Sequence, residues 1–349
     1  MGVEHTELIR AFAEQTWPER NRSRAFYRWR YAECPALAGY LAIRDGQCVA
    51  MVTALERPYQ IGGQSVDVRE SFDWFTLPRF KGGGAGVRVL QRMMKDEQPI
   101  TVIGGTSDTR DLLPRLGFRV LGELQSYSLP LGSRRASQVL AQRARIPPAV
   151  TRVVFAMARP LLLAPRPRQV PADGRVLPVT GIGPEAIALY ARCEHGVVPM
   201  WRLDHLRWLT DGFASTGSFV ALYFACADEL IGWSLLRVYA SEAGCQAQIV
   251  DLFAPSSNTE LFTWMVSETS CVAAGFRPDV VNALTTSPEL AHALRRNGYR
   301  KGVSLPIHMW DRSRESLPAP LFFGGQWGDI PLRPFPTNWW SADEADASD

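Results

Sequence analysis

The sequence has few of the residues that build disulfide frameworks and metal centres. Six cysteines occur in 349 residues, and none forms a CxxC pair. A disulfide scaffold needs a much denser set of cysteines. The five histidines show no HExxH spacing, the pattern of a helical zinc site. We therefore expect neither a disulfide framework nor a bound metal.

Long hydrophobic runs are also missing. No apolar run reaches about 18 residues, the length that a membrane-spanning helix needs. The opening residues MGVEHTELIR lack the basic and apolar regions of a signal peptide. Hydrophobic residues make up 46% of the chain and charged residues 21%, which excludes a mainly disordered or fibrous protein. The expected location is the cytoplasm.

Charge is small in total and uneven along the chain. The formal net charge is +3, yet residues 133–172 hold eight arginines and no acidic residue. The last ten residues hold four acidic side chains and no basic one. We expect a basic connector at 133–172, between a first domain (1–132) and a second (173–315). An extended Pro- and aromatic-rich arm with an acidic tail (316–349) follows.

The apolar part of the connector, 149–164, admits two interpretations. It contains two arginines, at 152 and 159, and is too short and too charged to span a bilayer. It is expected to form a helix packed against both domains. A weak contact with a membrane surface is the alternative.

Short motifs recur at a nearly constant distance. They are Arg28-Trp29 and Arg207-Trp208, Asp73-Trp74-Phe75 and Asp251-Leu252-Phe253, and Arg115-Leu116-Gly117-Phe118 and Arg296-Asn297-Gly298-Tyr299. The three distances agree within three residues, which indicates a duplicated unit. Two copies predict a pseudo-dimer, because a solenoid needs about three or more repeats.

Hydrophobic periodicity and turn residues predict the elements of the first copy. Helices are expected over 4–16 and 22–33. Strands follow, joined by a hairpin turn at Asp45-Gly46 and another at 61–64. After a strand ending at Pro78, we expect a glycine loop, a helix over 87–97, a strand over 100–105, a helix over 107–118 and a closing strand over 119–131.

The glycine loop, RFKGGGAG at 79–86, carries the clearest chemical signal. Four glycines in five positions let several backbone N–H groups point at one spot, and the helix that follows adds its positive N-terminal end. Arg79, Lys81 and Arg88 add cationic side chains. We predict a phosphate or pyrophosphate site. The GxxxxGK[ST] loop is absent, and a GxGxxG fingerprint lacks its third glycine.

Residues 1–132 resemble the GNAT superfamily of acyl-CoA N-acyltransferases. The family's loop, [Q/R]xxGxG/A, fits Lys81–Gly86, with Lys81 in place of Gln or Arg, and fits 79–84 in a shifted frame. The downstream LLPRLGF (112–118) is similar to the family's LYxKxGF segment. Residues 175–310 resemble a degenerate copy without the glycine loop. The implied fold class is α/β (α+β), with two GNAT-like domains. Each has a mixed, mostly antiparallel sheet flanked by helices.

The resemblance implies acetyl-CoA or another acyl-CoA as donor, and no metal. Its pantetheine arm would lie between two splayed central strands, and the loop amides would hold its pyrophosphate. The implied cofactor-binding residues are Phe75, Thr76, Leu77, Lys81, Gly82, Gly83, Gly84, Ala85, Gly86 and Val87.

For catalysis, the resemblance implies a carboxylate base on the strand before the loop. Glu70 and Asp73 are the candidates, and strand alternation places them on opposite faces. The family's acid is the tyrosine of LYxKxGF, and Leu113 stands there in this sequence. Ser107, Tyr127 or water would then protonate the leaving thiolate.

The second copy is expected to shape the acceptor cleft. Asp251, His195 and His205 could reach an acceptor, whereas a structural role is the alternative for each histidine. The aromatic residues near 26–31 and 201–208 are expected in the core, with a binding platform as the alternative.

The predicted function is transfer of an acetyl or longer acyl group to an amine of a small molecule, such as an amino sugar or amino acid. Two alternatives stay open: a Fem-like aminoacyl transferase that uses charged tRNA, and a non-catalytic acyl-CoA sensor or scaffold. Among partners, an acyl-carrier protein as donor is also left open, and no DNA is expected. The chain would be a monomer, as a pseudo-dimer, or a homodimer.

Overall fold

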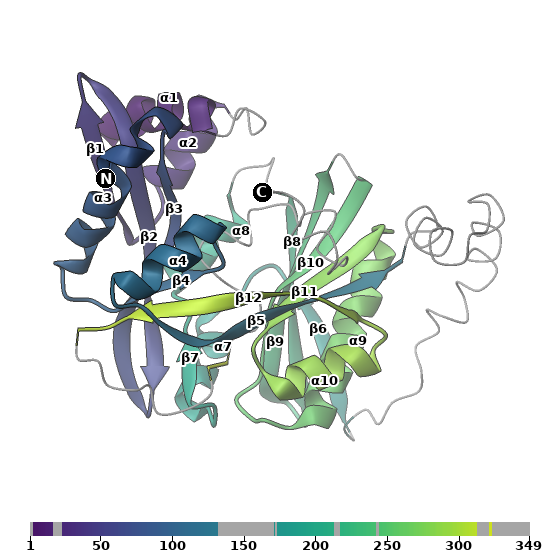
Figure 1. Ribbon diagram of the computed structural model, residues 1–349. Coiled ribbons are helices and arrows are strands. Elements are labelled where there is room, and N and C mark those ends of the chain that lie inside the picture. Colours follow the sequence, from purple (N-terminus) through teal and green to yellow (C-terminus); the bar gives the residue numbers. More distant parts are fainter. Residues whose placement is uncertain are drawn as a thin grey trace, which may run out of the picture.

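The structure is a computed structural model that describes residues 3–16, 23–131, 171, 173–212, 217–241, 244–312 and 321–322. Nearly all of the predicted connector, including 149–164, and most of the predicted arm lie outside the described residues. The predicted domain boundaries therefore stay predictions. Figure 1 shows the arrangement of the described elements.

The first half contains five strands and six helical segments among its described residues. In chain order they are η1 (Val3–His5), α1 (Thr6–Thr16), α2 (Arg24–Tyr31), β1 (Leu37–Arg44), β2 (Gln47–Ile61), β3 (Gln64–Thr76), η3 (Pro78–Gly83), α3 (Ala85–Met94), β4 (Ile100–Ile103), α4 (Ser107–Arg115) and β5 (Arg119–Pro130). These agree closely with the elements predicted from periodicity.

The second half repeats most of this order. Its described elements are β6 (Gly174–Val179), α7 (Pro184–Ala188), η4 (Leu189–Arg192), β7 (Val197–Pro199), α8 (Leu203–Thr210), β8 (Ser218–Cys226), β9 (Glu229–Ser241), β10 (Gly244–Phe253), α9 (Thr259–Gly275), β11 (Val280–Thr285), α10 (Pro288–Arg296) and β12 (Arg300–Trp310). The succession α2–β1–β2–β3–α3–β4–α4–β5 thus returns as α8–β8–β9–β10–α9–β11–α10–β12.

The hairpins form where turn chemistry predicts them. Asp45 and Gly46 both have positive φ, at 51° and 75°, and they join β1 to β2. Gly62 and Gly63, at 55° and 84°, join β2 to β3. Two consecutive residues in this conformation give a turn whose twist matches that of the flanking strands.

All the named strands join one sheet, with the order β1-β2-β3-β4-β12-β5-β11-β10-β9-β8-β6, and β7 pairs with β2 at its side. The last strands of the two halves are exchanged. β12 lies between β4 and β5, and β5 pairs in turn with β11. Figure 1 shows β5 and β12 running together across the middle of the molecule. Each half thus has the mixed sheet that was predicted, but the fusion of the two sheets was not predicted.

Helices cover both faces of the first half. Successive β2 side chains point to opposite faces of the sheet. Val52 and Ala54 pack with α3, whereas Met51 packs with α1 and α2. A further cluster draws from both halves and holds their sheets together; its buried members are Tyr59, Val68, Leu124, Val197, Leu284, Ile307 and Leu321. Among the described residues, no helix has the length and apolar character that crossing a membrane requires.

The strand exchange predicts a single cooperative unfolding transition. Ile307 in β12 is fully buried, and it pairs with β4 on one side and β5 on the other. We expect Ile307→Ala to lower the free energy of unfolding by about 2–4 kcal/mol. Tryptophan fluorescence and far-UV circular dichroism should report the same transition in urea.

A matched control is Val120→Ala in the neighbouring strand, because Val120 is 61% exposed. Its cost should stay within about 0.5 kcal/mol. Two separated transitions in either variant would contradict the coupling of the halves through β5 and β12.

Candidate functional site

The glycine loop forms a cradle at the start of α3. After β3, residues Pro78–Gly83 make a 3-10 turn, Gly84 adopts a left-handed conformation with φ of 70°, and α3 begins at Ala85. No side chain caps this helix. Its first N–H groups therefore remain available, and the helix dipole makes this end favourable for an anion.

The glycines of the cradle face open space. A Cβ added to Gly82, Gly83 or Gly84 would meet no heavy atom within 4 Å. Packing therefore does not explain why Gly82 and Gly83 lack side chains. Gly86 differs, because its Cβ would lie 2.2 Å from the Thr76 Oγ1 atom. Its carbonyl accepts a 2.8 Å hydrogen bond from the Trp74 indole, so Gly86 lets α3 approach the end of β3.

Cationic side chains surround the cradle. The Arg88 guanidinium donates to the Gly83 carbonyl at 2.6 Å. Lys81 is 58% exposed and lies 3.8 Å from the carboxylate of Asp108 in α4. Arg79 stacks over Phe80, with 5.0 Å between the guanidinium and the ring centre. Exposed cations beside open amides suit a phosphate or pyrophosphate group.

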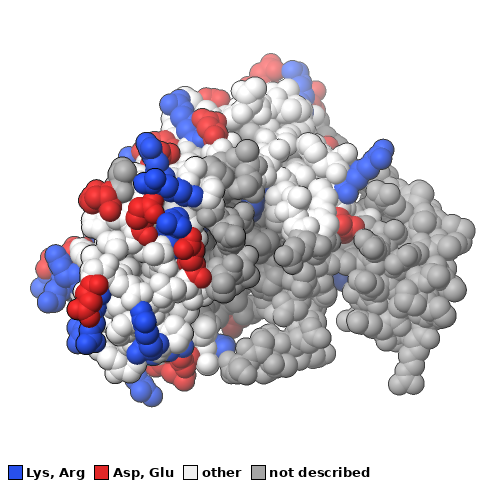
Figure 2. Space-filling model, turned by 90° about the horizontal axis from the view of Figure 1, so that it is seen from above, with Lys and Arg blue, Asp and Glu red and all other residues white. Residues whose placement is uncertain are grey.

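The wider surface does not add a single-sign field on the face in view. Figure 2 shows Lys and Arg intermixed with Asp and Glu over the first half. Several of these residues pair, as Arg10 does with Glu7 and Glu14 on α1. The anion preference of the site is therefore local, and it comes from the loop amides and their nearest cations.

A splay opens beside the cradle, between β3 and β4. The two strands pair in parallel from Arg69–Ile100 to Ser71–Val102, but β3 continues to Thr76. Its other edge stays paired with β2, through Met51–Phe75 and Ala50–Thr76. The pairing of β3 with β4 therefore ends at Ser71–Val102, and β3 runs on to Thr76 beyond it. An extended arm of a ligand could lie there.

The predicted cofactor-binding residues all lie at this end of the first half. Phe75 and Thr76 are half-buried at the end of β3. The Leu77 N–H donates to the Val49 carbonyl at 3.0 Å, so it is already used. Lys81, Gly82, Gly83 and Gly84 form the loop, and Ala85, Gly86 and Val87 begin α3. The structure thus brings these residues together, and their roles remain a proposal.

Glu70 is enclosed at the junction of the halves. It is fully buried, and it accepts from Arg57 at 3.1 Å and from the Tyr59 hydroxyl at 2.9 Å. Asp73 is also buried, and it accepts from Arg30 at 2.8 Å and from the Tyr31 hydroxyl at 2.6 Å. Each predicted base is therefore neutralised by an arginine and bonded to a tyrosine.

The prediction that Glu70 and Asp73 lie on opposite faces of the strand is wrong. The β2–β3 register shifts between Met51 and Thr53, and Asp73 has φ of 47°. This bulge breaks the alternation of side chains. Arg30 of α2 contacts both Asp73 and the ring of Phe72, which shares a face with Glu70. Both carboxylates thus lie on the side that α1 and α2 cover.

The predicted acids differ in position. Ser107 is half-buried at the start of α4, beside Asp108, which contacts Lys81 of the cradle. Leu113, which stands where a tyrosine was sought, is fully buried in the core beneath α3. Tyr127 is buried in the core of the second half, away from the cradle. Ser107 is therefore linked to the loop through its neighbour Asp108.

Sequence reasoning missed a buried polar cluster that joins the halves. The Arg57 Nε donates to the Met200 carbonyl at 3.3 Å, and its guanidinium lies 4.4 Å from the Trp201 ring centre. The Trp201 indole donates to Asp251 at 2.9 Å. Along β2, Arg57 is a charged residue among side chains whose alternation predicts burial. This exception was the sequence signal that could have revealed the cluster.

Burial dominates the titration of this cluster. It raises the pKa of Asp251 to about 7, against the opposing effects of the Arg57 charge and the Trp201 hydrogen bond. Burial, followed by repulsion from Arg57, lowers the pKa of His205 to about 4. The His205 Nε2 lies 2.8 Å from the Pro35 carbonyl oxygen. The contacts of His205 are therefore structural ones.

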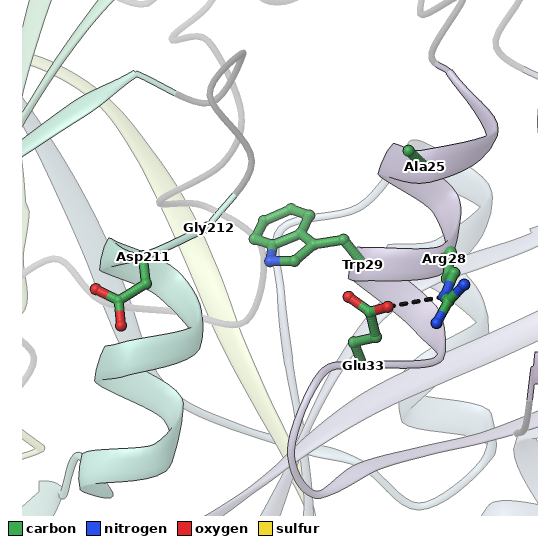
Figure 3. A pocket seen from close by; sticks show the side chains of 6 residues that line it. All are labelled: Ala25, Arg28, Trp29, Glu33, Asp211 and Gly212. Carbon is green, nitrogen blue, oxygen red and sulfur yellow. Dashed lines mark ion pairs between the residues drawn. The ribbon is translucent and has the colours of Figure 1, made fainter.

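A pocket lies between α2 and α8, the pair of helices related by the repeat. Trp29 and Trp208 stack with ring centres 4.6 Å apart, and the Trp208 indole donates to the Trp29 carbonyl at 3.1 Å. The pocket has a volume of about 330 Å³, and its lining residues, drawn in Figure 3, are Ala25, Arg28, Trp29, Glu33, Asp211 and Gly212. Its two carboxylates and one arginine give the lining a net negative charge.

The described residues at the start of α9, the helix that corresponds to α3, form no equivalent cradle. At α9, the Asn258 side chain accepts from the N–H groups of Glu260 and Leu261, at 2.9 and 3.1 Å. These N–H groups are therefore satisfied by the protein itself. The expectation that the second copy does not bind a nucleotide-type anion stays a prediction.

Comparison with known proteins identifies the fold. No protein-family model and no curated protein matches the chain. Solved structures do match over most of its length. A GCN5-related N-acetyltransferase from Anabaena variabilis has a TM-score of 0.58 and 14% identity, over 88% of this chain and 70% of the other. A probable N-acyltransferase from Enterococcus faecalis has a TM-score of 0.59 and 10% identity, with the same coverage.

The N-myristoyltransferase of Saccharomyces cerevisiae, solved with bound myristoyl-CoA, matches at a TM-score of 0.55. It is 13% identical, over 83% of this chain and 74% of the other. Sequence identity this low shows the fold alone. The chain has the fold of the GNAT-type N-acyltransferases, as the loop and the LGF segment predicted.

The raised pKa of Asp251 predicts a pH-dependent stability. The folded state holds the Asp251 proton up to about pH 7, whereas an unfolded chain releases it near 3.8. The stabilisation is therefore complete below pH 3.8 and is lost as the pH rises through 7. Urea unfolding from pH 4.5 to 8 should show this decline in wild type relative to Asp251→Asn.

Asp228→Asn is the matched control, because Asp228 is 85% exposed in a turn. It should leave the pH profile of wild type unchanged. A constant difference in unfolding free energy between wild type and Asp251→Asn over this range would show that Asp251 titrates normally.

Proposed function

We propose that the protein transfers an acetyl or longer acyl group from acyl-CoA to an amine of a small molecule. The observation that carries this proposal is the open glycine cradle at the uncapped start of α3, next to the splayed edge of β3. The two features suit the two ends of one ligand, a pyrophosphate and an extended arm.

In this proposal, the amides of residues 82–87 hold the pyrophosphate, and Lys81 and Arg88 add positive charge. The pantetheine arm lies along residues 75–77, in the splay between β3 and β4. A yeast protein of the same fold holds myristoyl-CoA, which supports an acyl-CoA donor. The thioester carbonyl would accept a hydrogen bond from a backbone N–H at the end of β3, which stabilises the charge that develops on its oxygen.

The reaction is a direct attack. The amine nitrogen forms a bond to the thioester carbon, the carbon–sulfur bond breaks, the amine releases a proton to a base, and the thiolate takes up a proton. Glu70 or Asp73 would receive the amine proton through water, because each is buried and already paired. Ser107 would protonate the thiolate.

The pocket between α2 and α8 suits the acceptor. Glu33 pairs with Arg28 at 2.8 Å (Figure 3). Asp211 therefore leaves the lining one negative charge in excess, which favours a cationic group, and Trp29 provides an apolar surface. The inner face of α2 contacts Asp73 through Arg30 and Tyr31. An acceptor bound there would lie one helix away from the bulge of β3.

A second candidate function is a non-catalytic acyl-CoA sensor. The specific observation in its favour is that both predicted bases are neutralised by arginine. Leucine also replaces the acid. Acyl-CoA binding without release of free thiol, across a broad panel of amines, would favour the sensor over the enzyme.

The cradle predicts a charge-sensitive cofactor site. Gly83→Asp places a carboxylate where the pyrophosphate would lie, without a steric clash. Repulsion should weaken acetyl-CoA binding by roughly 10- to 100-fold in an isothermal titration. Unfolding free energy should be unchanged, because the loop is exposed.

Two controls separate charge from other effects. Gly83→Ala adds a side chain without charge and should bind as wild type does. Gly275→Asp adds the same charge at the exposed end of α9, where a Cβ also meets open space. Wild-type affinity in Gly83→Asp would refute the pyrophosphate site.

The proposed acid predicts a split between binding and turnover. Ser107→Ala should lower kcat for thiol release from acetyl-CoA by about 100-fold. The KM for acetyl-CoA should stay the same, because the loop is intact. Ser107→Thr keeps the hydroxyl and should retain most of the activity. Equal kcat in Ser107→Ala and wild type would exclude this serine as the acid.

A further inference from the structure

The second half contains a splay like the first, built from the same elements. β10 and β11 pair in parallel as far as Ile249–Ala283, but β10 continues to Phe253 and β11 to Thr285. Phe253 corresponds to Phe75 in the sequence repeat. Thr286 directly precedes the N-cap of α10, as Gly105 directly precedes the N-cap of α4. The space between these strand ends is thus the counterpart of the proposed pantetheine site.

Two residues from the predicted arm occupy this place. The ring of Phe322 stacks on His195, with ring centres 4.0 Å apart, and lies 6.1 Å from Phe253 at the end of β10. Phe262, in the first turn of α9, lies 5.9 Å away. Phe322 is 4% exposed. It therefore fills an aromatic pocket between the strand end and the helix start.

The backbone of the same two residues is bonded as an added strand. The Phe322 N–H donates to the Val197 carbonyl at 2.8 Å, and Leu321 forms a parallel bridge with Val197. The Thr286 hydroxyl donates to the Leu321 carbonyl. The Leu321 side chain enters the cluster shared by both halves, beside Leu284. Backbone bonds with pockets for side chains are the way in which sheets bind extended peptides.

Three differences suit this cleft to a peptide and not to a nucleotide-type ligand. Asn258 satisfies the first N–H groups of α9, so no anion cradle is left. Thr286 supplies a hydroxyl where the first half has Gly105. The His195 Nε2 lies 3.0 Å from the Ala254 carbonyl oxygen, which fixes its ring as a wall for Phe322.

We propose that the second half carries a binding cleft for an extended peptide with an adjacent Leu–Phe pair, and that Leu321 and Phe322 of the same chain are its resident ligand. The comparison with pantetheine rests on the proposed function, whereas the cleft and its occupant do not. The consequence is that the second half is held closed by the chain itself, leaving the first half to bind acyl-CoA.

The experiment removes the Leu321 and Phe322 side chains from the full-length protein and then adds a peptide that carries both of them. Leu321→Ala/Phe322→Ala should lower the midpoint of thermal unfolding by roughly 5–10 °C, because two buried apolar side chains are lost. Phe322→Ala alone provides a milder variant if the double variant does not fold. A synthetic peptide with the sequence of residues 318–325, PAPLFFGG, should bind each variant and restore part of the lost midpoint. Wild type should not bind it.

The peptide PAPAAFGG, in which the Leu–Phe pair is replaced by alanines, is the matched ligand control and should not rescue. Phe276→Ala, at a 46% exposed phenylalanine, is the matched protein control and should keep the wild-type midpoint. An unchanged midpoint in both arm variants, or failure of PAPLFFGG to bind either, would overturn the proposal. Neither the unfolding midpoint nor the binding of the peptide involves acyl-CoA. The outcome of this experiment is therefore independent of the Gly83→Asp titration.

Discussion

The insertion of β12 between β4 and β5 is the constraint on which the remaining structure depends. A strand in the middle of a sheet must satisfy backbone groups on both edges. β12 therefore cannot detach from the sheet without exposing the backbone edges of β4 and β5, which belong to the other half. β5 is tied in the same way to β11. The exchange converts two related units into a single sheet and fixes the position of the first half, which carries the candidate site, against the second half.

That fixed position explains the buried charges at the junction. Arg57 and Glu70 come from the first half, and Trp201 and Asp251 come from the second. Burying an ion pair yields little net stability, but removing one partner leaves an uncompensated charge. The cluster therefore works as a registration device, because a small shift between halves would separate Arg57 from its partners. Asp251 relieves the excess negative charge by holding a proton, which is consistent with its pKa of about 7.

The sequence allowed prediction of features that depend on neighbours along the chain. The hairpin at Asp45-Gly46 and the loop at 79–86 each follow from a few adjacent residues, and both are present. The three short repeated motifs predicted the duplication, and the glycine loop together with LLPRLGF at 112–118 predicted the fold. The bulge at Asp73 was beyond this reasoning, because it depends on the β2 register and on Arg30 and Tyr31 from α2. The exchange of β5 and β12 was also hidden, because the partner of a strand depends on contacts between residues far apart in the chain.

The two halves differ in what lies beside the first N–H groups of the helix and beside the strand ends. A helix start and a splayed strand edge both leave N–H groups without partners, and a fold that is used twice creates this problem twice. In the first half, Gly84 offers no side chain to cap α3, and β4 pairs with β3 no further than Ser71–Val102. In the second, Asn258 caps α9, and Leu321 and Phe322 enter beside the strand ends. The same architecture thus leaves one helix start without a side-chain cap and gives the other a cap from its own chain. This difference supports the proposals of a ligand site in the first half and of a second half closed by its own arm.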